Sequence, residues 1–443
     1  MTTVIGRNVP DLDAELAEAY EVYSAKRPKS LEAFNAATEV MPGGNTRTVL
    51  FHPPYPFRAQ SGEGAWLTDI DGNRVLNLLG EYTAGLFGHD HPAIRSAVSE
   101  ALAGGLNLGA HNTYEARFAE LVCQRFAAIE KVRFTNSGTE ANLMALTAAR
   151  AYTGRSKVLV FEGGYHGGVF YFKSDVTTNA PYPWIKVAYN DTDAAVEAIR
   201  GNADDLAAVL VEPMQGGGGC FAGSPEFLAA LRHETETAGS LLIFDEVMTS
   251  RLGAGGAQEI YGIAPDLTTL GKWIGGGMSF GAFGGRADVL DLFDPRRSDA
   301  IGHAGTFNNN VLTMAAGIAA LDEVYTAQRA VDFTDWGDVV RKRLNEIAAD
   351  VDVPVCVTGM GTIMTLHPSQ PPVQSAADVA TIDPRLREIL FLDLLDAGYY
   401  IALRGFIALS LALKETDMDG FYVAFQSVLE KRANLLRYGA VNN

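Results

Sequence analysis

The sequence is poor in cysteine and in positive charge. It has three cysteines among 443 residues, Cys123, Cys220 and Cys356, and they form no CxxC pair. Such isolated cysteines exclude a disulfide framework and fit a reducing compartment, so we expect a cytoplasmic protein. Lysine and arginine number 35 against 53 acidic residues, which gives a formal charge of −18. A chain of this charge repels phosphate backbones, which argues against general nucleic-acid binding.

Long apolar runs and close clusters of metal ligands are also missing. The most apolar late stretch, Tyr399 to Leu413, is interrupted by Arg404 and is too short to span a bilayer. The first ten residues lack the apolar core of a signal peptide. His89-Asp90-His91 is an isolated close pair of histidines, which is weak support for zinc. We therefore expect neither a membrane partner nor a metal site.

Glycine, in contrast, is abundant. The chain has 46 glycines, about a tenth of its residues, against a typical share of about 7%. They gather in short clusters between apolar runs, at Gly163-Gly164, Gly167-Gly168, Gly216 to Gly219, Gly275 to Gly277 and Gly284-Gly285. Such clusters indicate loops in which the backbone approaches a ligand closely.

Three short apolar runs in the middle of the chain each end in an acidic residue. The runs are Val158 to Phe161 before Glu162, Ala208 to Val211 before Glu212, and Leu241 to Phe244 before Asp245. A helical pattern, Ser224 to Thr237, lies between the last two runs. Continuous apolar runs separated by helices indicate buried parallel strands, and ligands bind beyond the carboxyl ends of such strands. The acidic residues are expected at that edge.

The two ends of the chain have a different pattern. Residues 11–40 are expected to be helical, and Trp66 to Leu78 is expected to form a hairpin around Asp71-Gly72-Asn73. Amphipathic helices are predicted later at Asp335 to Asp350, Asp383 to Ala397 and Asp419 to Tyr438, with a strand-like run at Gly361 to His367. We therefore predict an α/β fold in which a large domain, residues 81–320, has a mostly parallel central sheet. The N-terminal segment, residues 1–80, and residues 321–443 would form a smaller α+β lobe.

The first motif with chemical content is Ser137-Gly138-Thr139, which precedes an apolar helical run, Ala141 to Tyr152. Small hydroxyl residues and a glycine at a helix start favour a bound phosphate, because free N–H groups and the helix dipole both attract an anion. Ser137 and Glu140 also have the spacing of an ordinary capping box, which is the structural alternative.

A carboxylate and a lysine form the second pattern. Asp245 closes a buried strand, where it could pair with a protonated ring nitrogen or serve as a helix cap or salt-bridge partner. Lys272 lies in apolar and glycine-rich surroundings, where an amine loses its charge easily and can form a Schiff base. The alternative is a surface lysine that extends its amine into solvent.

Two further segments complete a set of cofactor-binding groups. Tyr165, in the glycine-rich run Gly163 to Gly168, offers a ring that could stack on a planar cofactor. Thr306, in Gly302 to Asn310, offers a hydroxyl at an expected helix start. A phosphate cradle, a carboxylate for a ring nitrogen, a stacking ring and a Schiff-base lysine together match pyridoxal 5'-phosphate.

This arrangement resembles the class III (fold type I) aminotransferases, from about Pro42 into the C-terminal lobe. Asp245 and Lys272 are 272 − 245 = 27 positions apart, similar to the spacing in that family. The resemblance implies cofactor contacts from Ser137, Gly138 and Thr139 on the phosphate, Tyr165, His166, Glu212, Asp245 and Val247 around the ring, and Lys272 in the Schiff base. It also implies a homodimer with shared active sites, in which Thr306 reaches the phosphate of the neighbouring subunit.

Two branches of this family are candidates. Ser-Gly-Thr-Glu-Ala, Tyr-His-Gly, Phe-Asp-Glu-Val-Met and Leu-Gly-Lys-x-Ile-Gly-Gly-Gly are similar to glutamate-1-semialdehyde 2,1-aminomutases. Those enzymes usually carry Ser-Gly-Asn-Pro after the Gly-Thr pair, whereas this chain has Phe307-Asn308-Asn309-Asn310. Met41 to Phe51, Glu81 to Gly85, Met248 to Leu252 and Gly305 to Asn310 resemble aromatic β-amino acid (β-phenylalanine) aminotransferases. We therefore predict amino transfer from a β-phenylalanine-like donor to a keto acid such as 2-oxoglutarate or pyruvate, with the aminomutase as the alternative.

Substrate carboxylates need positive charge, and the resemblance favours Arg47 and Arg404 for that role. Either arginine could equally form a structural ion pair. Tyr82 is expected in the aromatic wall of the substrate pocket, together with Phe51, Phe307 and Tyr165, although each could be a core residue.

A rival from another enzyme class is a serine hydrolase, because Gly277 to Gly281 fits G-x-S-x-G around Ser279. That motif needs a strand before it and a helix after it. The surrounding glycines predict neither, so we regard the match as coincidental.

Overall fold

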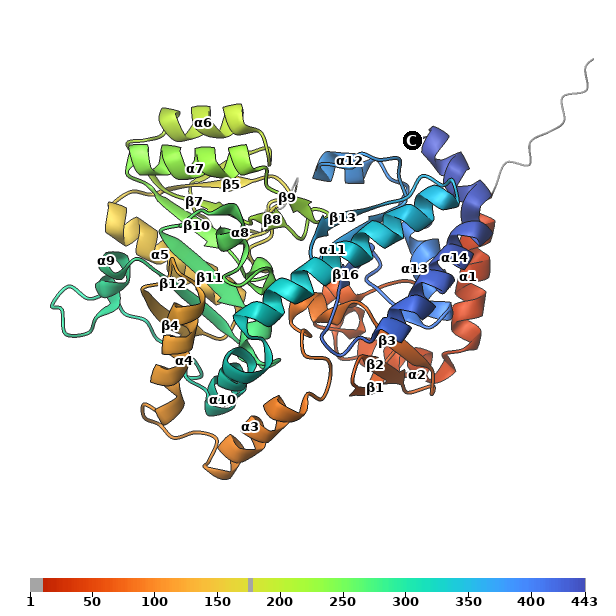
Figure 1. The fold of residues 1–443 in the computed structure, drawn as a ribbon, viewed down its shortest axis with the longest axis horizontal. Helices are drawn as coiled ribbons and strands as arrows, with labels where there is room; N and C mark the ends of the chain where they lie inside the picture. Colours follow the sequence, from red (N-terminus) through yellow and green to blue (C-terminus); the bar gives the residue numbers. More distant parts are fainter. Residues whose placement is uncertain (1–10, 174–177, 443) are drawn as a thin grey trace, which may run out of the picture. The chain divides into compact units, whose positions relative to one another are not determined.

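The structure is a computed structural model that describes residues 11–173 and 178–442. The chain divides into two compact units (Figure 1). The central unit comprises Glu81–Asp338 and Gly359–Thr362. The terminal unit comprises the described residues up to Gly80, Val339–Thr358 and the described residues from Ile363 onward. The predicted α/β class is confirmed, because the central unit contains a large, mostly parallel sheet.

The sheet of the central unit has seven strands. In sheet order they are β4 (Lys131–Thr135), β12 (Gly281–Gly285), β11 (Leu267–Gly271), β10 (Leu241–Asp245), β7 (Leu206–Val211), β5 (Lys157–Phe161) and β6 (Trp184–Val187). Strand β12 is antiparallel to both of its neighbours, and the pairs from β11 through β6 are parallel. The three apolar runs that predicted parallel strands are β5, β7 and β10, which are adjacent in the sheet.

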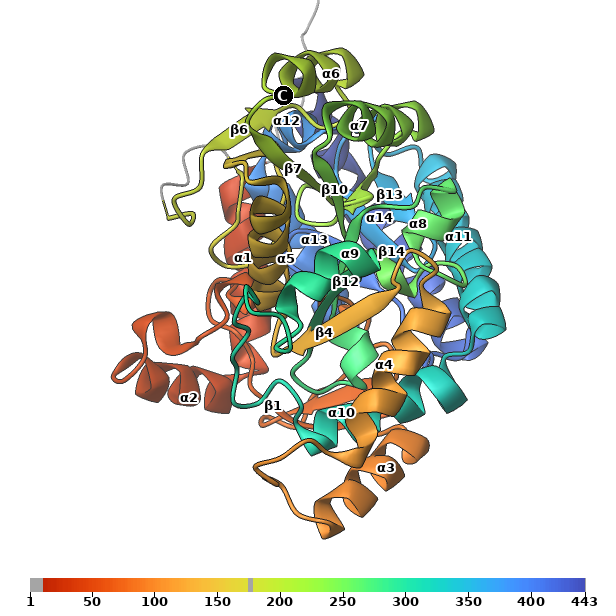
Figure 2. The same ribbon diagram turned by 90° about the vertical axis from the view of Figure 1, so that its left-hand side faces the viewer.

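Both faces of this sheet are buried, because alternate residues of each strand enter two different apolar clusters. On one face Val158, Leu210 and Ile243 pack with Ala145 and Leu146 of α5 (Gly138–Thr153). The opposite face packs against α6 (Thr192–Gly201) and α7 (Pro225–Ala238), which lie side by side in Figures 1 and 2. Burial on both faces explains why these strands are continuous apolar runs rather than alternating ones.

The central unit also contains α3 (Pro92–Ala103), α4 (Thr113–Arg125), α8 (Ala257–Tyr261), α9 (Ala287–Leu290), α10 (Val311–Ala319) and the two-stranded pair β8 (Met214–Gln215) and β9 (Phe221–Ala222). Helix α11 (Ala327–Asp350) and strand β13 (Cys356–Met360) contribute residues to both units.

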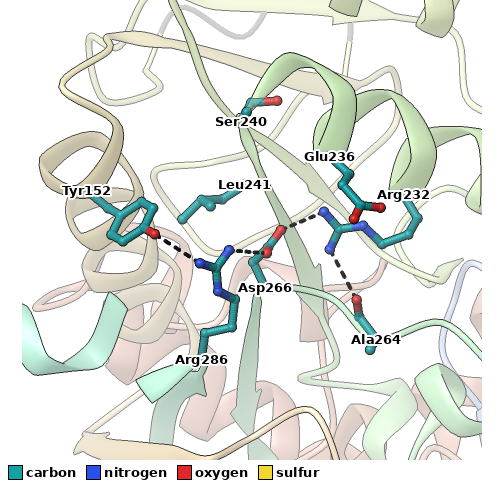
Figure 3. Close-up of a pocket in the computed structure, with 9 residues that line it drawn as sticks. Tyr152, Arg232, Glu236, Ser240, Leu241, Ala264, Asp266 and Arg286 are labelled. Atoms are coloured by element: carbon teal, nitrogen blue, oxygen red, sulfur yellow. Dashed lines mark hydrogen bonds and ion pairs between the residues drawn. The ribbon is translucent and has the colours of Figure 1, made fainter. Parts of the chain in front are cut away.

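Asp266, just before β11, organises the amino edge of the sheet. Its carboxylate accepts hydrogen bonds from the Leu242 N–H at 2.8 Å and from Arg286 at 2.9 Å, and it pairs with Arg232 at 2.9 Å. These groups border a cavity of about 410 Å³ (Figure 3). Because both arginines already engage Asp266, the cluster ties α7, β10 and β11 together and its charges are largely satisfied.

The terminal unit contains two small sheets and several helices. One sheet has the order β1 (Ala59–Glu63), β2 (Trp66–Asp69), β3 (Arg74–Asn77), β15 (Tyr399–Tyr400), and the other has β13, β14 (Ile363–His367), β16 (Phe406–Ala408). The helices are α1 (Leu12–Ala25), α2 (Pro28–Thr38), α12 (Ala376–Ala380), α13 (Pro384–Asp396) and α14 (Glu415–Asn442). None of the helices formed by described residues is long and apolar enough to cross a membrane.

The structure confirms the predicted hairpin and modifies the first helical prediction. Strands β2 and β3 pair antiparallel around the turn at Asp71-Gly72-Asn73. The helical segment expected over residues 11–40 is two helices, because Pro28 starts α2 and the preceding Arg27 has a non-helical φ of −135°. A proline at the first helical position is well accommodated, whereas it cannot continue the helix before it.

Candidate active site

A cavity of about 290 Å³ lies within the central unit, beyond the carboxyl ends of its strands. This volume is at the lower end of the range for small-molecule sites, about 300 Å³ and above. Nine residues predicted from the sequence line it: Ser137, Gly138, Thr139, Tyr165, His166, Glu212, Asp245, Val247 and Lys272. They follow strands β4, β5, β7, β10 and β11 or end them, so the parallel topology brings these separate loops together.

One wall of the cavity is the amino end of helix α5. Ser137 is the N-cap, and its side chain accepts a hydrogen bond from the Glu140 N–H at 3.2 Å. The Glu140 carboxylate accepts from the Asn136 N–H at 2.9 Å, so the reciprocal bond of a capping box to Ser137 is replaced. The first N–H groups of a helix have no partner within the helix and favour an anion.

Glycine is required at position 138 by close packing. A Cβ atom there would lie 2.8 Å from a methyl of Val247. Val247 in turn lines the cavity and follows Asp245 by two residues. The missing side chain of Gly138 therefore lets the start of helix α5 approach the loop that carries the buried carboxylate.

That carboxylate, Asp245, is 4% exposed and receives three hydrogen bonds. Its Oδ2 accepts from Asn142 Nδ2 and is joined to His166 Nδ1, both at 2.8 Å, and its Oδ1 accepts from the Val247 N–H at 3.0 Å. Asn142 is held from behind by the Thr269 hydroxyl, which donates to Asn142 Oδ1 at 2.8 Å. These contacts fix the orientation of the carboxylate, which suits it to a cationic partner in the cavity.

A second buried carboxylate, Glu212, has a different environment. It is 6% exposed and accepts backbone N–H bonds from Tyr165 at 3.0 Å and Gly216 at 3.2 Å. Burial raises the pKa of Glu212 to about 7, against the lowering effect of nearby His166. The two carboxylates therefore differ in their hydrogen-bond partners. Asp245 has side-chain partners as well as a backbone N–H, whereas Glu212 accepts the two backbone N–H bonds named above.

Lys272 is half-buried at the start of a 3-10 turn that follows β11. Its φ is +55°, a conformation that non-glycine residues rarely adopt. Residues held in such backbone conformations concentrate at functional sites, because the surrounding structure has to enforce them.

The loop after β5 supplies an aromatic ring to the cavity. Tyr165 is 47% exposed, so its ring is accessible to a planar ligand. Gly167 in the same loop has a φ of +121°, and a Cβ atom there would lie 2.2 Å from the Thr139 hydroxyl oxygen. Glycine thus brings this loop against the residue predicted to bind phosphate.

Thr306 and Tyr82 belong to the central unit but lie outside the set of described residues that line this cavity. The prediction that Thr306 lies at a helix start is wrong. Thr306 is exposed in a turn, and α10 begins at Val311 because Asn310 caps it by accepting the Leu312 and Thr313 N–H groups. Tyr82 is 8% exposed and is the middle of three consecutive non-glycine residues with positive φ.

The two predicted carboxylate ligands belong to the terminal unit. Arg47 is exposed and precedes a short 3-10 turn, Thr48–Leu50. Arg404 lies in the turn between β15 and β16, with its guanidinium 5.2 Å from the centre of the Phe406 ring. Gly405 makes this turn possible, because a Cβ at its φ of +87° would meet the Leu366 carbonyl oxygen at 2.1 Å.

Sequence reasoning assigned no role to Asn142, which the structure places on Asp245. The available signal was a polar residue inside an otherwise apolar helical run, since buried asparagines are usually hydrogen-bonded. Met248, Ser279 and Phe280 also line the cavity without having been predicted. Ser279 is preceded by a 3-10 turn and followed by strand β12, which confirms that the G-x-S-x-G match lacks the strand and helix of a hydrolase.

The cavity fits pyridoxal phosphate in three respects. The amino end of α5 suits a phosphate group, and the buried carboxylate of Asp245 suits a protonated ring nitrogen. Lys272 lines the same cavity and carries the amine that an aldehyde requires. Gly138 and Gly167 let the backbone approach Val247 and Thr139, two residues that line the cavity.

Comparison with known proteins shows the family of the chain. The model of the class-III aminotransferase family matches residues 51–405. A β-phenylalanine transaminase from Variovorax paradoxus is 50% identical over 426 residues, which is 96% of this chain and 98% of that protein. The crystal structure of a β-phenylalanine aminotransferase from that organism has a TM-score of 0.94 and covers 96% of this chain and 99% of its own.

More distant relatives include an aminomutase and a solved transaminase. A glutamate-1-semialdehyde 2,1-aminomutase from Rhodopirellula baltica is 36% identical over 92% of this chain and 97% of its own length. A solved transaminase with pyridoxal phosphate bound is 33% identical, with a TM-score of 0.84 and coverage of 93% of this chain and 99% of its own. The chain therefore belongs to the class III aminotransferases and is a pyridoxal-phosphate-dependent transaminase.

Proposed function

We propose that this transaminase takes the amino group from an aromatic β-amino acid resembling β-phenylalanine and passes it to a keto acid, 2-oxoglutarate or pyruvate. The observation that carries the proposal is the 50% identity, over 96% of the chain, with a β-phenylalanine transaminase. The four segments that resemble such enzymes in sequence support the same branch. The aminomutase relatives share less of the sequence, at 36% identity.

When bound, the cofactor supplies an electrophilic carbon for the substrate amine and a ring that takes up the electron pair of the reacting carbon. The protein's own groups provide the rest. Asp245 would hold a proton at the ring nitrogen, and its partners Asn142 and His166 orient its carboxylate. The Lys272 amine removes the proton from the carbon that bears the substrate nitrogen and returns it in the reverse direction.

The cofactor is held by the residues around these two groups. Ser137, Gly138 and Thr139 bind the phosphate at the amino end of helix α5. Tyr165 would stack on the ring of the bound cofactor, and Val247 would pack against that ring. Glu212 and His166 complete the ring's surroundings, and the burial of Glu212 supports a role there.

Substrate carboxylates are bound by arginine side chains. The chain has a net charge of −18, so positive charge for an anionic substrate has to be local. Arg47 and Arg404 supply it, each through a planar guanidinium that matches a carboxylate. Tyr82 contributes to the aromatic wall, and its φ of +51° supports a functional reason for its conformation.

The active unit is a homodimer in which each subunit completes the other's site. Thr306 reaches the partner's phosphate. Its exposed position, next to the 55% exposed ring of Phe307, supports a role outside its own subunit.

The test is replacement of the lysine, with a lysine of no proposed role as control. Lys272→Ala should abolish transamination of β-phenylalanine and the visible absorption band of the lysine-bound cofactor. Lys186→Ala, at an exposed lysine that pairs with Glu162 at 4.0 Å, should leave both unchanged. Full activity in Lys272→Ala would refute the assignment. Turnover of glutamate semialdehyde without any keto acid would favour the aminomutase.

A further inference from the structure

A buried hydrogen bond joins the segment after Asp245 to the residue after Lys272. The indole N–H of Trp273 donates to Ser250 Oγ at 2.9 Å, and both residues are 0% exposed. Ser250 lies five positions beyond Asp245, and Trp273 is the direct neighbour of Lys272. The bond therefore connects the two chain segments that carry the proposed ring carboxylate and the proposed catalytic amine.

The Trp273 ring is fixed from two further sides. It packs edge-on against Tyr325 with ring centres 5.1 Å apart, and it lies 6.3 Å from the ring of Phe87. The Tyr325 hydroxyl donates to the Arg251 carbonyl at 2.7 Å, so this ring is tied to the same segment as Ser250. The indole has little freedom, and its N–H points at a defined acceptor.

Ser250 is itself held on a rigid turn. Its N–H donates to the Glu246 carbonyl at 3.0 Å, and the Glu246 N–H donates to the Thr269 carbonyl on β11 at 3.0 Å. The Glu246 carboxylate is fully buried and accepts from the N–H groups of Ala257 at 2.7 Å and Gln258 at 2.9 Å. These hydrogen bonds hold the segment that carries Ser250 against β11, so the position of the Ser250 hydroxyl is fixed.

Lys272 needs such support because its backbone is in an unfavourable conformation. A φ of +55° is rare for a residue with a side chain, and it persists only where neighbours enforce it. Trp273 is the nearest buried anchor on the C-terminal side. If the indole moved, the backbone of Lys272 could relax and its amine would shift.

We propose that Ser250 is a positioning residue which, through its hydrogen bond with Trp273, fixes the Lys272 amine relative to Asp245. The inference rests on the proposed function, because it takes Lys272 as the group that moves the substrate proton. Loss of the serine hydroxyl leaves the indole N–H buried without an acceptor, which favours a shift of the ring. A small displacement of a catalytic group lowers the rate far more than it lowers substrate binding.

The test uses two substitutions that break the same bond from opposite sides. Ser250→Ala removes the acceptor, and Trp273→Phe keeps an aromatic ring without the N–H. Ser240→Ala is the matched control, since Ser240 is also buried and stands at the other end of β10 (Figure 3), where its hydroxyl donates to the Thr235 carbonyl at 3.4 Å. These three variants, the Ser250→Ala/Trp273→Phe double variant and wild type are all assayed as holoenzymes.

We expect kcat to fall about ten- to a hundredfold in Ser250→Ala and in Trp273→Phe, with KM within about twofold of wild type. The pH midpoint of the visible cofactor band should shift in both variants by more than the scatter given by Ser240→Ala. The kcat of the double variant should be no lower than that of the less active single variant, because both substitutions remove the same interaction.

Two results would overturn the inference. One is Ser250→Ala behaving like Ser240→Ala in kcat and in the pH midpoint. The other is additive losses in the double variant. If Ser250→Ala fails to fold, Trp273→Phe decides alone by the same two readouts. An inactive Lys272→Ala together with a normal Ser250→Ala refutes only this inference, whereas an active Lys272→Ala refutes the proposed function itself.

Discussion

Replacing Gly167 by alanine tests the proposed phosphate cradle through the packing of two loops. Gly167 has a φ of +121°, and an added Cβ would lie 2.2 Å from Thr139 Oγ1, 2.6 Å from its Cβ and 2.8 Å from its Cα. Because one of these contacts is with a backbone atom, rotation of the Thr139 side chain cannot relieve the overlap. Either the Thr139 backbone moves or the loop after β5 moves.

The expected magnitude follows from two costs. A side chain at such a φ costs about 1–3 kcal/mol, and overpacking adds typically about 1–3 kcal/mol. The sum is about 2–6 kcal/mol. If the loops yield, Thr139 leaves its proposed place on the phosphate, and the lower figure alone corresponds to a roughly thirtyfold weaker cofactor affinity.

The assay is titration of the apoprotein with pyridoxal phosphate, followed by the visible band. Gly168→Ala is the control, because a Cβ at the neighbouring glycine meets nothing within 4 Å. We expect Gly167→Ala to bind the cofactor at least about thirtyfold more weakly and Gly168→Ala to match wild type. Equal affinity in Gly167→Ala and wild type, in a folded protein, would refute the cradle.

Two further predictions concern the carboxylates. In the apoprotein the raised pKa of Glu212 stabilises the fold below about pH 4.5, and this contribution is lost as the pH rises through about 7. The unfolding free energy of wild type relative to Glu212→Gln should therefore fall by about 3 kcal/mol across that window, measured by denaturant titration; a flat difference would contradict the assigned burial. Asn142→Leu removes a donor to Asp245 worth about 1.5–3 kcal/mol, so cofactor affinity or kcat should fall about ten- to a hundredfold, and Thr269→Val should have a smaller effect. A larger loss in Thr269→Val than in Asn142→Leu would contradict the account in which Thr269 acts on Asp245 through Asn142.

The central strands could be predicted from the sequence because a strand that is buried on both faces is a continuous apolar run. The runs that form β5, β7 and β10 are continuously apolar, and an acidic residue follows or ends each of them. The cavity residues on these edges could therefore be expected to meet. Asn142 could not be assigned, because its partner Asp245 is 103 positions away and only the folded helix brings them together.

The expectations that differed from the structure concern local conformation. Thr306 was expected at a helix start, but Asn310 is the stronger cap and delays the helix by a few residues. The break between α1 and α2 carries its signal in Pro28, which a broad helical pattern over residues 11–40 conceals. Ser250 and Trp273 are 23 positions apart, and no sequence pattern around either residue predicts their hydrogen bond.

The measurement that tests the proposed function most directly is the response of the visible cofactor band to candidate amines, with no keto acid present. We expect β-phenylalanine to bleach the band with formation of one β-keto acid per active site, and 2-oxoglutarate or pyruvate to restore it. Glutamate semialdehyde should not be turned over. A band that β-phenylalanine leaves unchanged, together with turnover of glutamate semialdehyde in the absence of any keto acid, would contradict the proposal.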